Sequence, residues 1–507
     1  MSGLDLAIIA AYLAGITLFG LRFRKQQRSL KDYFLADRNV PWWAISLSIV
    51  AAETSTLTII STPGLSYQGN LTFLQVVLGY LVGRVVISVL MIPHYFRGEL
   101  FTAYQLMERR FGAKLRSLTA SLFLITRAAA EGVRVFAVSI VVGIALGPLL
   151  GGLTDLQRDL VAIGIVTALT LIYTFEGGMT AVIWTDVAQM FIYVAGTMVG
   201  FVTLLRLIPG GWATVSSVGE SAGKFQVLNF TGGWAQPYTF WAGAIGGAFL
   251  TTASHGADQL IVQRLLAARS EGQSKLALIS SGVAVLFQFS LFMLIGVMLL
   301  VFYQRPPAAF GGADRIFPTF IVTRLAHGVA GLLIAAILAA AMSNLSAALN
   351  SLSSSTIVDF YLRRRQGASE RDMLRVSRVA TLAWALALFA LAVVSRRSQS
   401  VIVVGLSIAS VAYGALLGVF LLGLLTKRAH QRGAMAGMLV GFCTNMYIWI
   451  STLLPARALP LGWFTRQIPW TWYVAIGACL TFGVGYAASL AMAPDRTTEN
   501  REQGQHA

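Results

Sequence analysis

The chain of 507 residues contains repeated apolar segments that are each about 20 residues long. A helix of that length spans the hydrocarbon core of a bilayer, which is about 30 Å thick. Lipid offers no hydrogen-bond partner to the backbone, so such segments cross a membrane as helices that pair their own backbone groups. Charged residues make up only 12% of the chain, against about 25% in a soluble protein. The sequence therefore predicts an all-α polytopic membrane protein.

We predict thirteen transmembrane helices, at residues 4–21, 42–66, 71–93, 118–146, 159–174, 180–208, 236–263, 274–303, 316–358, 373–394, 400–425, 433–454 and 472–493. Lys and Arg number 25 in the loops on one side of these spans and 8 in the loops on the other. By the positive-inside rule, the N-terminus lies outside and the C-terminus lies in the cytoplasm, in a plasma membrane or a bacterial inner membrane. The basic residues behind the net charge of +17 then lie mainly on the cytoplasmic side, where they face anionic lipid. We therefore predict no nucleic-acid partner.

The chain carries no motif for chemistry on a substrate. There is no HExxH, no phosphate-binding glycine loop and no CxxC, so we expect neither an enzyme nor a bound cofactor. No loop is long enough for a soluble domain, and the polar tail 494–507 is expected to be disordered. The lack of a nucleotide-binding motif excludes a self-contained ATP-driven pump, so any transport by this chain would draw on an ion gradient or be passive.

Two of the predicted spans are interrupted by polar residues and glycines. The second span contains Glu53 and several Ser and Thr residues before Pro63-Gly64, and the seventh contains His255-Gly256 and Asp258. These spans are five apart, which is the pattern expected when two inverted repeats each contribute a broken helix to a site at the membrane midplane. The alternative is two ordinary helices with polar packing faces.

The stretch 339–356 carries oxygen-bearing side chains at helical spacing. Ser343, Ser346, Asn350 and Ser353 fall on one face of a helix. Small residues of this kind let helices approach closely, so packing is one interpretation. The other is a site for a hard cation, which prefers oxygen ligands.

Several ionisable residues lie within the spans, where each should be paired or hydrated. Arg127, Glu131 and Arg134 can neutralise one another along one helix, which favours a structural role. Glu53 has no cation nearby in the sequence, so it can meet Arg84 or Arg134, contact a solute, or take up a proton.

Five segments resemble the sodium/solute symporter family, which includes sodium-coupled carriers of sugars, proline, sialic acid, iodide, monocarboxylates and vitamins. They are residues 34–43, 173–189, 259–264, 350–361 and 414–434, and the resemblance covers residues 5–435 in one order. It implies a LeuT-like core of ten helices in two inverted five-helix repeats. The predicted division is an N-terminal helix and loop (1–41), the two repeats (42–208 and 209–435), two C-terminal helices (436–493) and the tail (494–507).

The resemblance also implies a sodium site. Its ligands would be the backbone carbonyls of Ala51, Thr54 and Ala340 with the side chains of Ser343 and Asn344. Most members carry Ser or Thr where this chain has Asn344, whose amide offers a carbonyl oxygen and also a donor. A second sodium site would use Asp186, Ser343 and Ser346, although Ala347 stands where that site has a hydroxyl.

The 173–189 run has a physical interpretation of its own. Gly177-Gly178 would form a tight cytoplasmic turn, and Trp184 would lie at the membrane interface. Asp186 would begin the next helix, where a carboxylate suits the positive end of the helix dipole.

We predict that the solute binds in a central cavity between the repeats. The candidate contacts are Glu53, Thr56, Thr58, Gln75, Thr251, Ser254 and Asp258. Arg84 or Arg134 would pair with an organic anion, or each would serve as an internal salt-bridge partner.

The predicted function is sodium-coupled symport of a small polar or anionic organic solute into the cell by alternating access. The predicted partners are the lipid bilayer, sodium as a co-substrate and the solute, and a monomer would suffice. One alternative is a proton-coupled carrier that uses Glu53 or Asp258. The other is a sensor of the same fold that transports nothing.

Overall fold

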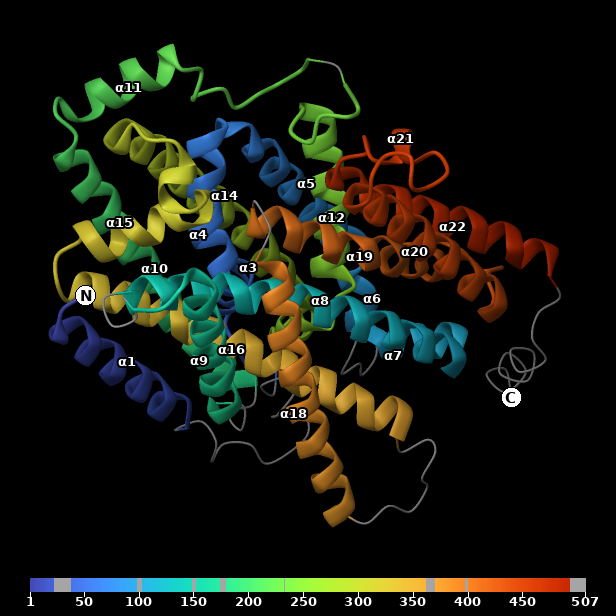
Figure 1. The fold of residues 1–507 in the computed structure, drawn as a ribbon. Helices are drawn as coiled ribbons and strands as arrows, with labels where there is room; N and C mark the ends of the chain where they lie inside the picture. The colour runs from blue at the N-terminus through green and yellow to red at the C-terminus, as the bar shows by residue number, and fades with distance from the viewer. Residues whose placement is uncertain are drawn as a thin grey trace. The chain divides into compact units, whose positions relative to one another are not determined.

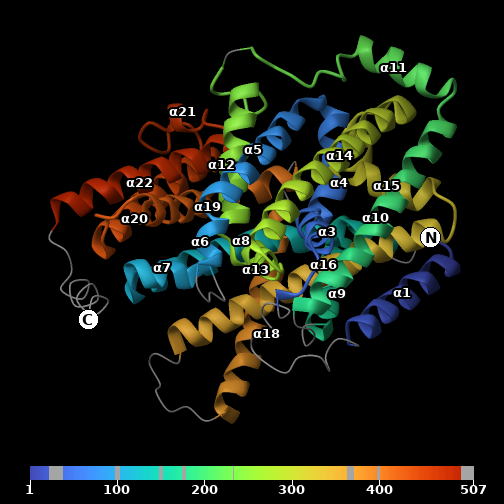
Figure 2. The ribbon, with the colours of Figure 1, turned by 180° about the vertical axis from the view of Figure 1, so that it is seen from behind.

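The chain is built from helices joined by loops and short 3-10 turns (Figure 1; Figure 2 shows the reverse side). The computed structural model describes residues 1–21, 38–97, 103–147, 152–173, 179–231, 233–361, 370–396 and 400–492. The helices of the first half are α1 (Gly3–Leu21), α3 (Trp42–Glu53), α4 (Thr56–Gln68), α5 (Leu74–Leu90), α6 (Ile92–Phe96), α7 (Ala103–Phe111), α8 (Ala113–Ala145), α9 (Asp155–Tyr173), α10 (Met179–Leu207), α11 (Gly211–Ser221) and α12 (Phe240–Gly256). Those of the second half are α13 (Gln259–Leu266), α14 (Glu271–Tyr303), α15 (Ile316–Arg324), α16 (Val329–Ser355), α18 (Glu370–Ser395), α19 (Val401–Leu425), α20 (Gln431–Leu453), α21 (Gly462–Thr465) and α22 (Tyr473–Ala491).

Nine helices within the described ranges are long and apolar enough to cross a membrane. The pair α3 and α4 makes a tenth crossing if the two helices, which are bent by 64° at their break, are counted as one span. The prediction of a helical, multi-pass membrane protein is therefore confirmed. The count of thirteen spans and the two inverted repeats stay predictions.

The predicted span 316–358 is divided in the structure. The stretch 316–358 forms two helices, because α15 ends at Arg324 and α16 begins at Val329. Leu325 is extended (ψ 151°), and Gly328 adopts a positive φ of 90°, a conformation that glycine reaches without steric cost. Arg324, His327 and Gly328 lie at this break, so the sequence held a signal that the prediction of one span passed over.

The chain forms two compact units, and α16 is the centre of the first. Unit 1 comprises Met1–Leu74, Arg127–Val227 and Val283–Gly405. Within it α16 packs against α1, α4, α9, α10 and α18, and α1 runs alongside it in Figure 1. The apolar window of α16 is 78% buried, the largest share among the nine spans found in the described ranges. Its many alanines allow this close approach of neighbouring helices.

Unit 2 comprises Gln75–Thr126, Leu228–Gly282 and Leu406–Ala507, and its most extensive helix pair is α20 with α22. Gly433, Gly437 and Gly441 recur every four residues on α20 and face the backbone of α22. Small residues at this spacing let two helices approach until their backbones touch. The contact units are a different division from the predicted repeats, which the structure leaves as a prediction.

We predict that Gly437→Leu lowers the thermal unfolding midpoint, by roughly 5 °C or more, because overpacking strains a close helix contact. A Cβ at Gly437 would press on the Thr481 carbonyl oxygen and lie 2.7 Å from the Gly485 Cα. The control is Gly483→Leu, since a Cβ at Gly483 meets nothing within 4 Å. Unfolding in detergent, followed by intrinsic fluorescence, measures both variants, and equal midpoints would contradict the packing argument.

Candidate functional site

The break between α3 and α4 is an inverse γ-turn centred on Thr54. Thr54 has φ −80° and ψ 69°, and the Ser55 amide donates to the Glu53 carbonyl oxygen at 2.9 Å. In a continuous helix that amide would donate to the carbonyl of Ala51, four residues back. The turn thus diverts a hydrogen bond away from Ala51, one of the two carbonyls predicted to bind sodium on this segment.

Polar side chains hold this turn from both sides. The buried Thr54 hydroxyl donates to Gln288 Oε1 on α14 at 2.7 Å, which ties the turn to α14. The Thr58 hydroxyl donates to the Glu53 carbonyl at 3.2 Å. Sequence reasoning missed Gln288, although it is the only amide side chain between residues 274 and 303 and so carried a visible signal.

The other three predicted sodium ligands lie on α16, in the same unit. Ala340 is buried, and Ser343 and Asn344 are half-buried. α16 is continuous from Val329 to Ser355, so a carbonyl such as that of Ala340 offers a ligand only its second lone pair. Because α16 packs against α4, the five predicted ligands belong to neighbouring segments of unit 1.

Within the described ranges, no three His, Cys, Asp or Glu side chains lie together as a group that could hold a metal ion. The predicted sodium site is made instead of carbonyl and hydroxyl oxygens. The five ligands stay a prediction.

Asp186 has a different local role from the one expected. α10 begins at Met179, so Asp186 lies about two turns inside the helix and does not begin it. Its Oδ2 accepts a hydrogen bond from the Ser48 hydroxyl of α3 at 2.6 Å, and both residues are buried. Gly177-Gly178, the expected turn, lies outside the described residues. Trp184 contacts Trp43, with 5.6 Å between ring centroids.

The second predicted sodium site also falls within unit 1. α10 packs against both α3 and α16, and Ser346 of α16 is buried like Asp186. The contact with Ser48 shows that Asp186 already serves as an acceptor between α10 and α3. Its assignment to sodium stays a prediction.

The predicted solute contacts are divided between the two units. Glu53, Thr56 and Thr58 lie at the α3/α4 break in unit 1, where the buried Thr56 hydroxyl has no hydrogen-bond partner among the described residues. The other four candidates, Gln75, Thr251, Ser254 and Asp258, belong to unit 2. Their meeting in one cavity stays a prediction.

Two of the unit 2 candidates have structural partners. Gln75 is fully buried, donates to the Tyr238 carbonyl at 3.0 Å and accepts from the Asn229 amide at 2.9 Å. Asp258 caps α13 by accepting from the Leu260 amide at 2.9 Å, and its second oxygen accepts from Tyr413 at 2.9 Å. Both carboxylate oxygens of Asp258 therefore already have donors.

Arg84, Thr251 and Ser254 lie near the same interrupted helix of unit 2. Arg84 is fully buried, and its guanidinium lies 3.4 Å from His255 Nε2 and 3.3 Å from the Ser281 hydroxyl. Ser254 contacts the other ring nitrogen of His255 at 2.8 Å, and Thr251 is buried. His255 thus serves as a structural link between Arg84 and Ser254.

The charged trio on α8 forms as predicted. Glu131 is fully buried, Arg127 lies 3.0 Å from it, and Arg134 makes a second ion pair with the same carboxylate oxygen. Two guanidinium groups share one carboxylate, so the group carries a net charge of +1. The Arg134 side chain keeps 29% of its surface exposed, against 11% for Arg127, which leaves Arg134 the more accessible cation.

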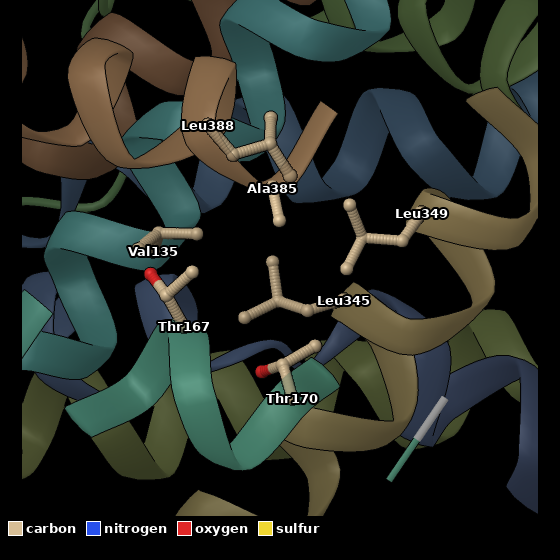
Figure 3. A pocket seen from close by; sticks show the side chains of 7 residues that line it. All are labelled: Val135, Thr167, Thr170, Leu345, Leu349, Ala385 and Leu388. Carbon is tan, nitrogen blue, oxygen red and sulfur yellow. The ribbon is translucent and has the colours of Figure 1, made fainter. Parts of the chain in front are cut away.

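A small pocket lies between α8, α9, α16 and α18 (Figure 3). It is lined by Val135, Thr167, Thr170, Leu345, Leu349, Ala385 and Leu388. The hydroxyls of Thr167 and Thr170 donate to carbonyls of their own helix, so the pocket wall is apolar. Such a lining does not suit a polar solute.

We predict that Glu131→Ala destabilises the fold by about 3–5 kcal/mol, because it leaves two membrane-embedded guanidinium groups without their shared carboxylate. The matched control is Glu108→Ala. Glu108 pairs with Arg116 at 2.9 Å, but both side chains are about one-third exposed, so we expect a loss of at most about 1 kcal/mol. Chemical denaturation in mixed micelles compares the two, and a similar loss for both would show that burial does not set the effect.

The comparisons with known proteins agree with one another. A model described as the sodium:solute symporter family matches residues 33–441. The chain is 28% identical to the sodium/sialic acid symporter SiaT of Proteus mirabilis over 98% of each chain, and 26% identical to the human sodium/iodide cotransporter over 89% of this chain and 70% of that one. It resembles the structure of a substrate-bound, outward-open Na⁺-coupled sialic acid symporter with a TM-score of 0.79 and 28% identity, over 97% of this chain and 99% of the other.

Proposed function

Because the chain belongs to the sodium:solute symporter family, we propose that it is a secondary active transporter in which an inward sodium gradient drives uptake of a small anionic solute. Transport proceeds by alternating access in a LeuT-like core of ten helices among thirteen spans. The N-terminus lies outside and the C-terminus in the cytoplasm. The protein acts as a monomer, without catalysis and without an organic cofactor.

The observation that supports sodium coupling is the γ-turn at Thr54. It opens the α3/α4 helix beside α16, and both segments carry predicted sodium ligands in one compact unit. A bound cation would join a segment that is broken to one that is continuous. It would shift the conformational equilibrium by its difference in affinity for the two states, which is the only way an ion can drive the change.

The observation that favours an anion is the net positive charge at Glu131. Arg134 shares its carboxylate with Arg127 and keeps 29% of its side chain exposed, so it can accept a second negative partner. The relatives point the same way, since those reported above are named for sialic acid and for iodide, an organic and an inorganic anion. We therefore add Arg134 to the proposed solute contacts, which are Glu53, Thr56, Thr58, Gln75, Thr251, Ser254 and Asp258.

Purified protein in liposomes tests the sodium site. We expect Ser343→Ala to raise the sodium concentration for half-maximal uptake by about tenfold, as the loss of one oxygen ligand implies. Asn344→Ser should lower that concentration, because a hydroxyl replaces an amide whose NH₂ group repels a cation. An unchanged value for Ser343→Ala would remove this residue from the site.

The solute is tested by thermal shift in saturating sodium, with sialic acid, iodide, a short monocarboxylate and a neutral sugar as probes. Ligands stabilise the state to which they bind, so an anion among them should raise the unfolding midpoint and the sugar should not. Arg134→Gln should abolish the anion-induced shift and keep the shift caused by sodium. Arg116→Gln, which breaks a surface pair with Glu108, serves as the control. Stabilisation by the sugar alone would contradict an anionic solute.

The second candidate is proton coupling through Glu53, which is half-buried at the break, or through Asp258, whose carboxylate oxygens both accept hydrogen bonds. Replacing sodium by choline over a pH series separates the two mechanisms, because a proton carrier keeps its uptake in choline and loses it on Glu53→Gln or Asp258→Asn. A sensor of the same fold would bind its solute in both ions and accumulate none.

A further inference from the structure

A loop lysine is inserted into the end of the helix that follows the γ-turn. Lys224 Nζ donates to the carbonyl oxygens of Tyr67 at 2.9 Å, Gln68 at 3.3 Å and Gly69 at 2.6 Å. These are the last carbonyls of α4, which have no partner within the helix. The negative end of the α4 dipole therefore meets a positive charge.

The backbone around Lys224 forms a closed turn that directs the side chain toward the end of α4. Gly223 turns the backbone with φ +64°, and the Lys224 amide then donates back to the Gly219 carbonyl at 2.8 Å. Phe225 packs on Gly219, so the turn after α11 is closed by an apolar contact. Lys224 itself is only 9% exposed, and burial lowers the pKa of its ammonium group. The buried ammonium group has lost its hydrating water, and three carbonyl oxygens accept its hydrogen bonds instead. Lys224 is therefore a fixed contact and not a mobile surface side chain.

The mirror arrangement occurs at the start of α16. Asp5 of α1 is 1% exposed, and its Oδ1 accepts from the amides of Gly328 at 2.7 Å and Gly331 at 3.2 Å. Its Oδ2 accepts from the Ser2 amide at 2.8 Å and from His327 Nδ1 at 3.0 Å. A carboxylate thus caps the positive end of the α16 dipole.

α4 and α16 pack against each other within unit 1. α4 extends from the break that holds two of the predicted sodium ligands, and α16 carries the other three. α4 begins at Thr56, just after the turn at Thr54 that ends α3, the helix of Ala51. α16 carries Ala340, Ser343 and Asn344. Neither Lys224 nor Asp5 belongs to the predicted ligand set. Each instead fixes one end of a helix whose position sets the distance between the two groups of ligands.

We propose that Lys224 and Asp5 are positioning residues for the cation site, each holding one of the two helices between which the ion binds. This inference rests on the sodium coupling proposed above. Loss of either charge lets the end of α4 or α16 relax and displaces the ligands. Sodium affinity falls as a result, while the transport rate at saturating sodium is retained, since the ion restores the arrangement when it binds.

The test is a sodium titration of the thermal unfolding midpoint and of uptake, with Lys224→Met and Asp5→Asn. We expect the sodium midpoint of each variant to rise about three- to tenfold, in the range by which residues outside a site modulate coupling. Lys224→Arg, which keeps the cation, should remain within about twofold of the wild type. Lys224→Gln gives a second measure of the charge if Lys224→Met does not fold.

The matched controls are surface charges in exposed ion pairs. Lys275→Met removes a lysine that pairs with Glu271 at 2.6 Å. Asp155→Asn removes a carboxylate that lies beside Arg158, and the Asp155 side chain is 96% exposed. Both should leave the sodium midpoint unchanged.

A purely structural role gives a different result. It would lower the stability of Lys224→Met and Asp5→Asn equally with and without sodium and leave the sodium midpoint in place, and that outcome overturns the inference alone. Wild-type protein with no sodium-dependent stabilisation overturns the proposed sodium coupling and this inference with it.

Discussion

The constraint on which the structure depends is that a backbone in lipid must satisfy its own hydrogen bonds. Each place where a helix stops inside the protein therefore needs a local substitute. At Thr54 the substitute is a γ-turn supported by Gln288, and at Asp258 it is a carboxylate cap supported by Tyr413. These supports explain why polar side chains occur at those depths. The helix ends held by Lys224 and Asp5 follow the same logic with full charges.

The positions of the breaks could be predicted from the sequence, but the supports could not. Interrupted polar segments marked the second and seventh predicted spans, and the structure has helix ends at Glu53 and Gly256. The partners lie far away in the chain: Gln288 is 234 residues from Thr54, and Tyr413 is 155 from Asp258. Periodicity is a local property and carries no information about such pairs. The trio on α8 was predictable because its three members lie within one helix.

Two local predictions were wrong. Asp186 suggested a helix start, whereas α10 begins at Met179 and the carboxylate bonds to Ser48 on another helix. The prediction of one span over 316–358 passes over Arg324, His327 and Gly328, which stand where the backbone breaks between α15 and α16. The sodium ligands and the shared solute cavity stay predictions, because the first are identified by resemblance and the second joins residues of two separate units.

The unequal stiffness of α16 and the α3/α4 turn has a thermodynamic consequence. On a continuous helix, residues three and four apart are held in a fixed relation before any ion arrives. At the γ-turn, the carbonyl of Thr54 belongs to a residue outside any helical ladder, and that of Ala51 lies in the last turn of α3, where the Ser55 amide no longer bonds to it. At the proposed sodium site, the entropy lost on coordination would therefore fall mainly on the turn and less on α16. The selectivity of that site among monovalent cations would then depend on how far the turn, held by Gln288, can move toward α16.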